Sequence, residues 1–488
     1  MGLVNRKVLI DVLGIEYQGV NGLFASILTI LGVAELGIGT AIIYNLYKPL
    51  AERDIPKIQS IIQFYSKCYW LIAFAMSGIG LIISFHLPFF VTESSLPINL
   101  QVVFLLILGE IVATYTFAYK RSILQADQRN YLISTINTIF IVVANVLQLL
   151  ILLYLKDYYI FLGSKLICRI IENVVVNIVV NHYYPFLKKK TDRPLDSNIL
   201  YDIKQKIKGL LFHKIGTFVV NSTDNILISK FFGLALVGVY SNYFYVISSA
   251  SAIVQQAFDG ITGSVGNLIA VSDMKKRMLI FKQLNLLNIF ISSLCVNCVL
   301  ILINPFITIV FGDDYLLDDY ILFALIFNMI LSVHRLVYGI FKTAAGIQYE
   351  DRYVPIAECM VNLFMSLLLM HKLGLVGVYL GTTVSMICQY GITFPIFIYK
   401  KVLGGNYIDY SIYLLRTLGY YLISACISWL SVKNISMESI YIDSFVKLLC
   451  VISMNIILFW VVYHRDNSYN YIIDRMCKFI KKDEKPGC

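Results

Sequence analysis

The sequence predicts an all-α membrane protein whose helices cross the bilayer many times. Hydrophobic residues make up 58% and charged residues 14% of the 488 residues, with a mean hydropathy of +0.74. Soluble domains are about 45–50% apolar and about 25% charged. The apolar residues also form repeated runs of membrane-spanning length, and the basic residues gather in alternate loops between these runs. Such a chain needs lipid as its solvent.

Each long apolar run predicts one spanning helix, because a helix satisfies its own backbone polar groups where no water is present. Continuous apolar segments exclude a membrane barrel, whose strands would show short alternating patterns. We expect about 13 spans, at 20–45, 63–92, 97–119, 131–155, 158–181, 210–230, 237–270, 283–310, 320–341, 354–371, 374–399, 410–432 and 440–463.

Loop charge predicts the orientation of these spans. One alternate set of loops carries 27 Lys and Arg residues, and the other set carries 4. The positive-inside rule then places the basic set, including the tail from residue 464, in the cytoplasm. The acidic loop that contains Asp313 and Asp314 falls outside. A bias that follows loop parity indicates topology, so we expect no nucleic-acid binding.

An internal repeat organises the chain into two lobes. At an offset of 219 residues, the segment beginning LGIEYQGVNG lies over FGLALVGVYS, and the match extends to Asp54/Asp273 and Lys57/Lys276. At an offset of 222, YKRSILQADQRNY lies over FKTAAGIQYEDRY. Both blocks keep their membrane side, which is typical of a parallel repeat of six spans.

The repeat predicts that most of the first helix is missing, because residues 1–14 are too short to span and their counterpart begins at about residue 210. We expect an N-terminal lobe, a basic cytoplasmic linker, a C-terminal lobe, an additional C-terminal helix pair and a cytoplasmic tail, at 1–181, 182–209, 210–399, 400–463 and 464–488.

Several segments resemble the Wzx-type polysaccharide flippases of the MATE-like exporter superfamily. They begin LGIEYQGVNG (13–22) and KIGTFVVNSTDN (214–225), and AFDGITGSVGNL (257–268), LQADQRNY (124–131) and GIQYEDRYVPIAECMVNL (346–363) fit the same group. The resemblance covers nearly the whole chain. It implies two six-helix lobes that use alternating access and, in most members, 14 spans, from which this chain departs at its N-terminus.

The resemblance also implies a function. An undecaprenyl-pyrophosphate-linked oligosaccharide would pass from the cytoplasmic to the outer leaflet of a bacterial cell membrane, for cell-surface polysaccharide assembly. The polymerase and glycosyltransferases of the same pathway, together with membrane lipids, would be the partners. An ion-coupled drug or metabolite exporter of the same fold is the alternative. No hydrolase or transferase motif is present, so we expect no enzyme.

A pyrophosphate needs cations inside the spans. Arg6, Arg169, Lys214 and Arg335 lie outside the loops and are the candidates for this role. For Arg169 the alternative is a structural pair with Glu172 three residues further on. Arg335 has no acid within one helical turn, so we expect it to be more available to an anion.

Two intramembrane acids are candidates for ion coupling. Asp224 lies in VNSTDNILISK, where oxygen-bearing side chains suit Na⁺ or H⁺, although the same cluster would serve as an interhelical contact. Glu35 has glycines at 32, 37 and 39 that permit close helix approach. We expect no structural metal and no cofactor beyond such a coupling ion.

Overall fold

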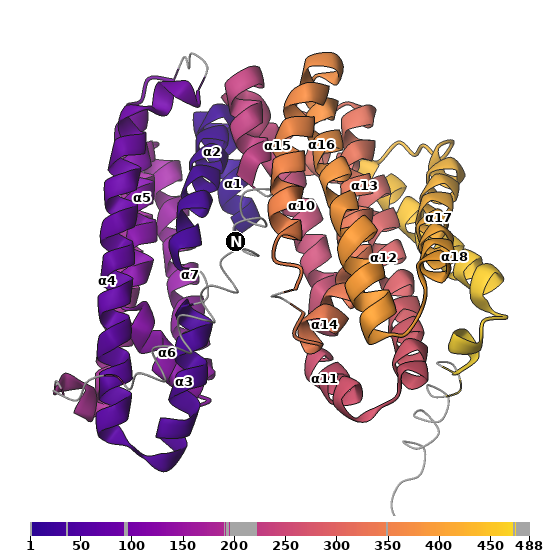
Figure 1. Cartoon of the computed structure of the whole chain (residues 1–488). Helices are drawn as coiled ribbons and strands as arrows, with labels where there is room; N and C mark the ends of the chain where they lie inside the picture. The colour runs from indigo at the N-terminus through magenta and orange to yellow at the C-terminus, as the bar shows by residue number, and fades with distance from the viewer. Residues whose placement is uncertain are drawn as a thin grey trace, which may run out of the picture. The chain divides into compact units, whose positions relative to one another are not determined.

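The structure is a computed structural model, and it describes residues 2–35, 38–91, 96–189, 191, 195, 222–347, 350–471 and 474. The described residues form helices joined by short turns (Figure 1). The chain divides into two compact units, residues 1–241 and 242–488. The division falls within α10 (Leu234–Asp259).

The first unit is built from α1 to α8, a helix at 222–232 and the first turns of α10. The elements before residue 190 are α1 (Gly2–Leu13), α2 (Ile15–Leu31), η1 (Gly32–Glu35), α3 (Ile38–Glu52), α4 (Ile55–Phe85), η2 (Leu87–Phe89), α5 (Leu100–Thr116), α6 (Ala118–Ala126), α7 (Asn130–Tyr154), α8 (Tyr158–Tyr183) and η3 (Pro185–Lys188). Helix α5 packs between α4 and α8, and α1 packs on α2 and α7.

Apolar side chains of these helices form two buried clusters. In one, Tyr65 and Ile61 of α4 pack with Val176 of α8. In the other, Phe24 of α2 packs edge-on against Phe104 of α5, with ring centroids 5.1 Å apart. These clusters hold α5 and α8 together, so polar side chains between the two helices have fixed partners.

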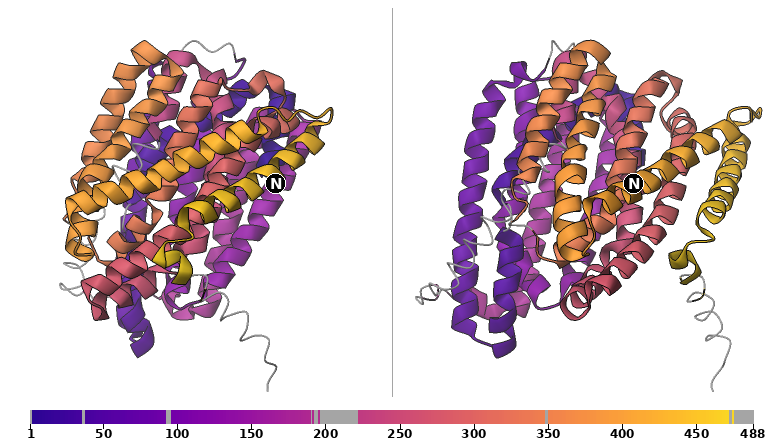
Figure 2. Two further views of the ribbon diagram at one scale, coloured as in Figure 1. Left: turned by 90° about the vertical axis from the view of Figure 1, so that its right-hand side faces the viewer. Right: turned by 45° about the vertical axis from the view of Figure 1, so that its right-hand side comes forward.

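The second unit contains the rest of α10, followed by α11 (Thr262–Val271), α12 (Met274–Val310), η4 (Asp313–Tyr315), α13 (Asp319–His334), α14 (Leu336–Ala344), α15 (Val354–Leu373), α16 (Leu375–Cys388), the π-helix η5 (Gln389–Val402), α17 (Tyr407–Val432) and α18 (Ile440–Tyr463). Helices α15 and α16 approach closely at Gly381, which has no side chain. A Cβ there would lie 2.2 Å from the Ser366 hydroxyl. Helices α17 and α18 run side by side and pack on α12 (Figure 2).

The predicted spans agree with these helices except at their breaks. Every predicted span outside 210–230, which lies mostly beyond the described residues, overlaps a described helix. The span expected at 20–45 is divided by η1, and the one at 237–270 is divided at Gly260 and Ile261. In the described part of the chain, seven helices are long and apolar enough to cross a membrane, or eight if α5 and α6, bent by 43°, form one span.

The internal repeat is confirmed in local structure. Gly14 and Gly233, matched by the 219-residue offset, both have left-handed φ, 110° and 91°, directly before a helix. Asp54 and Asp273 are both N-caps, and each accepts a hydrogen bond from the backbone N–H three residues further on, over 3.1 and 3.2 Å. Matched caps begin α4 and α12, which are the longest helices of their units.

Repeat-related glycines also meet within the first unit. A Cβ on Gly19 of α2 would lie 1.9 Å from the carbonyl oxygen of Leu234, and one on Gly238 of α10 would lie 2.4 Å from that of Ile15. The offset of 219 exchanges these two contacts with one another. The start of α10 therefore crosses α2 backbone to backbone, which only glycine permits at these positions.

Candidate functional site

A polar stripe runs along one face of α8. Lys165, Arg169, Asn173, Asn177 and Asn181 recur every four residues, and Glu172 follows Arg169 by three, so these side chains lie on the same side of the helix. This face is directed toward α5 and α6. Helix α8 is otherwise rich in Ile and Val, so the stripe is a polar surface on a largely apolar helix.

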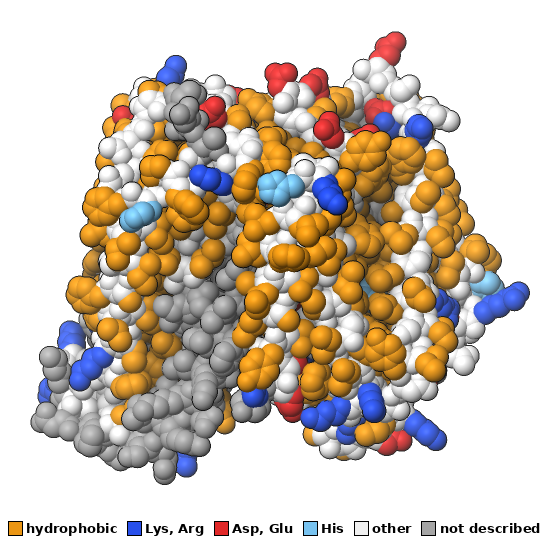
Figure 3. Space-filling view, turned by 45° about the horizontal axis from the view of Figure 1, so that its top comes forward, with side chains coloured by type: hydrophobic (Ala, Val, Ile, Leu, Met, Phe, Trp, Pro, Cys, Tyr) orange, Lys and Arg blue, Asp and Glu red, His pale blue; other side chains and the backbone are white. Residues whose placement is uncertain are grey.

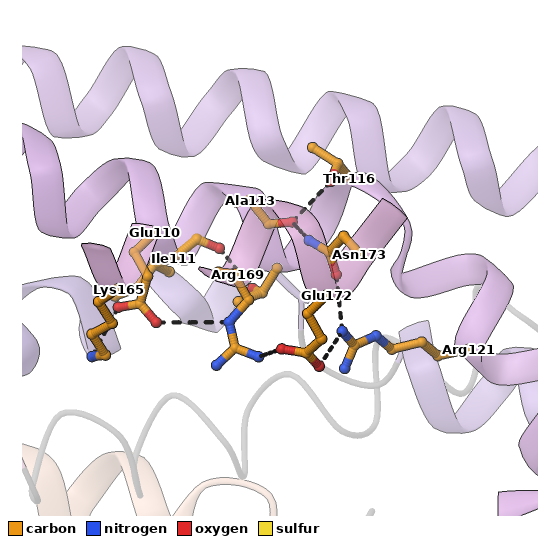
Figure 4. A network of polar contacts seen from close by, with 10 residues as sticks. Glu110, Ile111, Ala113, Thr116, Arg121, Lys165, Arg169, Glu172 and Asn173 are labelled. Atoms are coloured by element: carbon orange, nitrogen blue, oxygen red, sulfur yellow. Dashed lines mark hydrogen bonds and ion pairs between the residues drawn. The ribbon is translucent and has the colours of Figure 1, made fainter. Parts of the chain in front are cut away.

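Charged residues of this stripe form a continuous chain with α5 and α6 (Figure 4). Glu110 of α5 is 3.0 Å from Nζ of Lys165 and 3.7 Å from Nε of Arg169. Arg169 also pairs with Glu172 at 2.6 Å, and Glu172 accepts from Arg121 of α6 at 2.8 Å. Three cations thus alternate with two carboxylates.

Burial differs between the acids and the bases of this chain. The Glu172 and Glu110 side chains are 3% and 11% exposed, whereas Arg169 is 25% and Lys165 is 49% exposed. Each buried carboxylate has two cations, so neither charge is left uncompensated. The three cations and two carboxylates together carry a net charge of one positive unit. The cations are the more exposed of these side chains, an arrangement that suits an anion.

Three asparagine side chains of α8 hold cations of α6 beside the charged chain. Lys120 of α6 donates to the side-chain oxygens of Asn177 and, over 2.9 Å, Asn181. Asn173 accepts from Arg121 over 2.9 Å and donates to the Ala113 carbonyl over 2.5 Å. Neutral amides position these cations without cancelling their charge.

Arg335 has an acidic partner that the sequence did not indicate. It lies between α13 and α14, and its guanidinium is 3.5 Å from Glu358 of α15. Glu358 also accepts from Gln389 over 2.6 Å. Arg335 has no acid within one helical turn, as expected, but helix packing brings it to Glu358, so it is less available to an anion than the sequence suggests.

The structure describes one of the other two candidate cations, Arg6, but not Lys214. Arg6 of α1 is half-buried and donates to the Ser241 carbonyl over 2.9 Å. Lys214 lies outside the described residues. Of the four predicted cations, Arg169 belongs to the charged chain of the first unit and Arg335 to an ion pair of the second.

Glu35 lies at a helix break and faces two tyrosines. Tyr69 donates to its carboxylate over 3.5 Å, and Tyr115 also contacts it. A Cβ on Gly39 would lie 3.3 Å from the Tyr69 hydroxyl, and one on Gly32 would lie 3.6 Å from that of Tyr115. Only at Gly39 would a side chain be crowded by a hydroxyl group next to the acid, because 3.6 Å at Gly32 is an ordinary contact.

Asp224 is buried in the helix at 222–232. Its neighbour Asn225 donates to the Ser26 hydroxyl over 2.8 Å and to the Gly22 carbonyl over 3.4 Å, which joins this helix to α2. Within the described residues, no group of three or more His, Cys, Asp or Glu side chains could hold a metal ion.

The sequence reasoning missed part of the charged chain. Lys120 and Arg121 fall in the basic loop between the spans expected at 97–119 and 131–155, and Lys165 is not among the candidate cations. The informative signal was the spacing of Asn173, Asn177 and Asn181, which repeats every four residues within a predicted span.

Solved transporters share this fold. A lipid II flippase, MurJ, in an inward closed conformation has a TM-score of 0.67 at 17% identity, covering 95% of this chain and 96% of the flippase. An inward-facing multidrug resistance MATE family transporter of the MOP superfamily has a TM-score of 0.61 at 14% identity, covering 85% and 94%. The MATE transporter VcmN of Vibrio cholerae has a TM-score of 0.50 at 13% identity, covering 80% and 95%.

No protein-family model and no curated protein sequence matches the chain. The likeness is therefore one of architecture, spread over nearly the full length of each solved structure. The chain has the fold of the MATE and MurJ transporters.

Proposed function

We propose that this protein flips a lipid-linked oligosaccharide, carried on undecaprenyl pyrophosphate, from the cytoplasmic to the outer leaflet. The observation that carries this proposal is a row of four cations on α6 and α8, which we name the cation row: Lys120, Arg121, Lys165 and Arg169. Intramembrane ionisable residues by default serve a substrate or an ion pathway. The shared fold with a flippase of a lipid-linked substrate supports the same class of cargo.

The chemistry of the row suits a pyrophosphate. Arg169 and Arg121 offer planar forks that match phosphate oxygens in a bidentate way, and Lys165 and Lys120 add point charges. The carboxylates between them are the more buried groups, so an anion meets the cations first. Arg6, Lys214 and Arg335 remain candidates for further contacts along the path of the substrate.

An ion gradient is the proposed energy source, with Asp224 and Glu35 as candidate coupling residues. The Glu35 carboxylate, the hydroxyls of Tyr69 and Tyr115 and the end of α2 form an oxygen-rich site at a broken helix. Such interrupted helices hold Na⁺ or H⁺ in other transporter folds. Asp224 lies among hydroxyl and amide side chains of the helix at 222–232, which suits the same ions.

The proposed setting is the bacterial cell membrane, with the C-terminus in the cytoplasm and the pathway's polymerase and glycosyltransferases as partners. The loop charges support this orientation. An ion-coupled MATE-type exporter of cationic compounds is the second candidate function. The fold shared with a MATE multidrug transporter supports it.

A flipping assay separates the two functions. The full chain is reconstituted in vesicles containing a fluorescent polyprenyl-diphosphate sugar, and the probe reaching the opposite leaflet is measured with and without an imposed Na⁺ or H⁺ gradient. We expect gradient-stimulated flipping that falls at least tenfold in Arg169→Ala and loses its gradient response in Asp224→Asn or Glu35→Gln.

The matched control is Lys447→Ala, which removes a cation paired with Asp443 at 2.7 Å in the second unit, and it should flip normally. Uptake of a cationic dye without flipping of the diphosphate would reject the flippase in favour of the exporter. Equal loss in Lys447→Ala and Arg169→Ala would remove the cation row from the site.

A further inference from the structure

The additional helix pair borders a groove in the second unit, which shares no residue with the charged chain. Two adjoining hollows of about 420 and 540 Å³ share Lys282 of α12 and Tyr413 and Arg416 of α17 in their walls. Pockets of about 300–1,000 Å³ are the usual size for small ligands. We name this surface the α12–α17 groove.

Apolar side chains form the floor of the groove and close-packed backbone forms one wall. Met278 and Leu286 of α12 line it. A Cβ on Gly404 would lie 2.8 Å from the Met274 sulfur, and one on Gly405 would lie 2.4 Å from the Tyr399 ring. Asn285 donates to the Tyr413 hydroxyl over 2.8 Å and fixes its ring. The site is therefore built by packing.

Four cations surround this floor, against two acids. Arg416 pairs with Asp466 at 3.4 Å and lies 5.3 Å from the Tyr463 ring centroid. The other three, Lys275, Lys282 and Arg465, are exposed, and the described residues give them no ion-pair partner. Asp409 is the remaining acid. The groove therefore presents a net positive rim over an apolar floor.

The position of the groove suggests the bilayer surface. Its walls come from 274–289, 399–417 and 463–468, which include parts of three loops of the basic set. In Figure 3, Lys and Arg side chains gather at the lower right edge of the face shown, below a band of hydrophobic side chains. On α17, Ile412 and Leu415 are 62% and 72% exposed beside the groove and offer an apolar surface to acyl chains.

We propose that the α12–α17 groove binds the phosphate headgroup of an anionic membrane phospholipid. Basic pockets between membrane helices on the cytoplasmic side recognise such headgroups, and the cytoplasmic leaflet supplies them. The phosphate lies among Lys282, Arg416 and Arg465, and the acyl chains run along α17. The site is separate from the proposed transport site and does not rest on it.

Binding of phosphatidylglycerol to the full purified chain tests this site. Native mass spectrometry measures affinity for phosphatidylglycerol, for zwitterionic phosphatidylcholine and for soluble glycerol phosphate. The variant Lys282→Gln with Arg465→Gln removes two exposed cations, so folding is retained. We expect it to bind phosphatidylglycerol roughly 30-fold more weakly than the unmodified chain, because each basic residue near an anionic headgroup contributes about fivefold.

The matched control, Lys67→Gln with Lys276→Gln, removes the same charge outside the groove and should keep the affinity. Three outcomes would overturn the proposal. They are unchanged binding in the groove variant, equal loss in the control, and saturable binding of glycerol phosphate alone, which would assign the groove to a soluble phosphate ester. Flipping activity is measured separately, so its absence would leave this result unaffected.

Discussion

Arg169 and Arg335 are both paired with acids of the helices. The acids that pair with Arg169 each have a second cation, whereas the acid that pairs with Arg335 has only a neutral second partner among its described contacts. Without Arg169, Glu110 keeps Lys165 at 3.0 Å and Glu172 keeps Arg121 at 2.8 Å. Without Arg335, Glu358 keeps only the neutral Gln389 among the contacts that the structure describes for it. Removing one partner of a buried pair is costly because the remaining charge is uncompensated.

We therefore expect Arg335→Ala to destabilise the protein by about 1–3 kcal/mol, below the cost for a fully buried pair because Arg335 is 28% exposed. Arg169→Ala should cost less than Arg335→Ala, because Glu110 and Glu172 each keep a second cation. Thermal melting of the detergent-purified chain measures both. Adding Glu358→Gln to Arg335→Ala should restore part of the lost stability. Equal melting of the two single variants would contradict the compensation argument.

At the scale of elements, glycines decide where helices break and where they touch. The run at 20–45 is apolar enough for one helix, yet η1 interrupts it beside Glu35. The Tyr69 hydroxyl, which contacts Glu35, lies only 3.3 Å from where a Cβ on Gly39 would be, so a larger residue there would be crowded. The run of apolar residues predicts the length of a span. The position of the break depends on which side chains of neighbouring helices pack against the span.

The crossing of α2 and α10 gives a prediction at this scale. Gly19→Ala and Gly238→Ala each place a methyl group against a backbone carbonyl, at 1.9 and 2.4 Å. The two helices must separate, which we expect to lower stability by about 1–3 kcal/mol or more. Gly163→Ala in α8 is the control, because no atom lies within 4 Å of its added Cβ.

In this control the alanine should leave the melting temperature unchanged or raise it, since alanine favours a helix over glycine by up to about 1 kcal/mol. Melting of the three purified variants provides the comparison. If Gly19→Ala melts like Gly163→Ala, the backbone contact between α2 and α10 does not support the fold.

For the whole molecule, loop charge predicts which side of the membrane each end faces. Alkaline phosphatase inserted after Tyr315, in the acidic loop, should be active because it folds outside the cell. The same enzyme after Lys401 should be inactive, and green fluorescent protein at the C-terminus should fluoresce in the cytoplasm. The physical reason is the excess of Lys and Arg in one set of loops. Activity at both insertion points would reject this orientation.

The amino-acid sequence alone predicts an all-α membrane protein, the approximate positions of its spans and its internal repeat. Lipid demands apolar side chains and internal hydrogen bonds in each span, so every span carries its own signal in consecutive residues. The matched N-caps Asp54 and Asp273 and the matched glycines Gly14 and Gly233 are equally local, because each acts on backbone within a few residues. For this reason the offset of 219 could be detected before any helix was placed.

Tertiary structure alone settled the partners of the intramembrane charges. Glu110 meets Lys165, Glu172 meets Arg121, and Arg335 meets Glu358, each from a different helix. An ion pair depends on the distance between atoms across a helix interface, and that distance follows from how the apolar faces pack. The sequence marked Arg169 and Arg335 as costly to bury, and the packing of helices within each unit decided which acids compensate them.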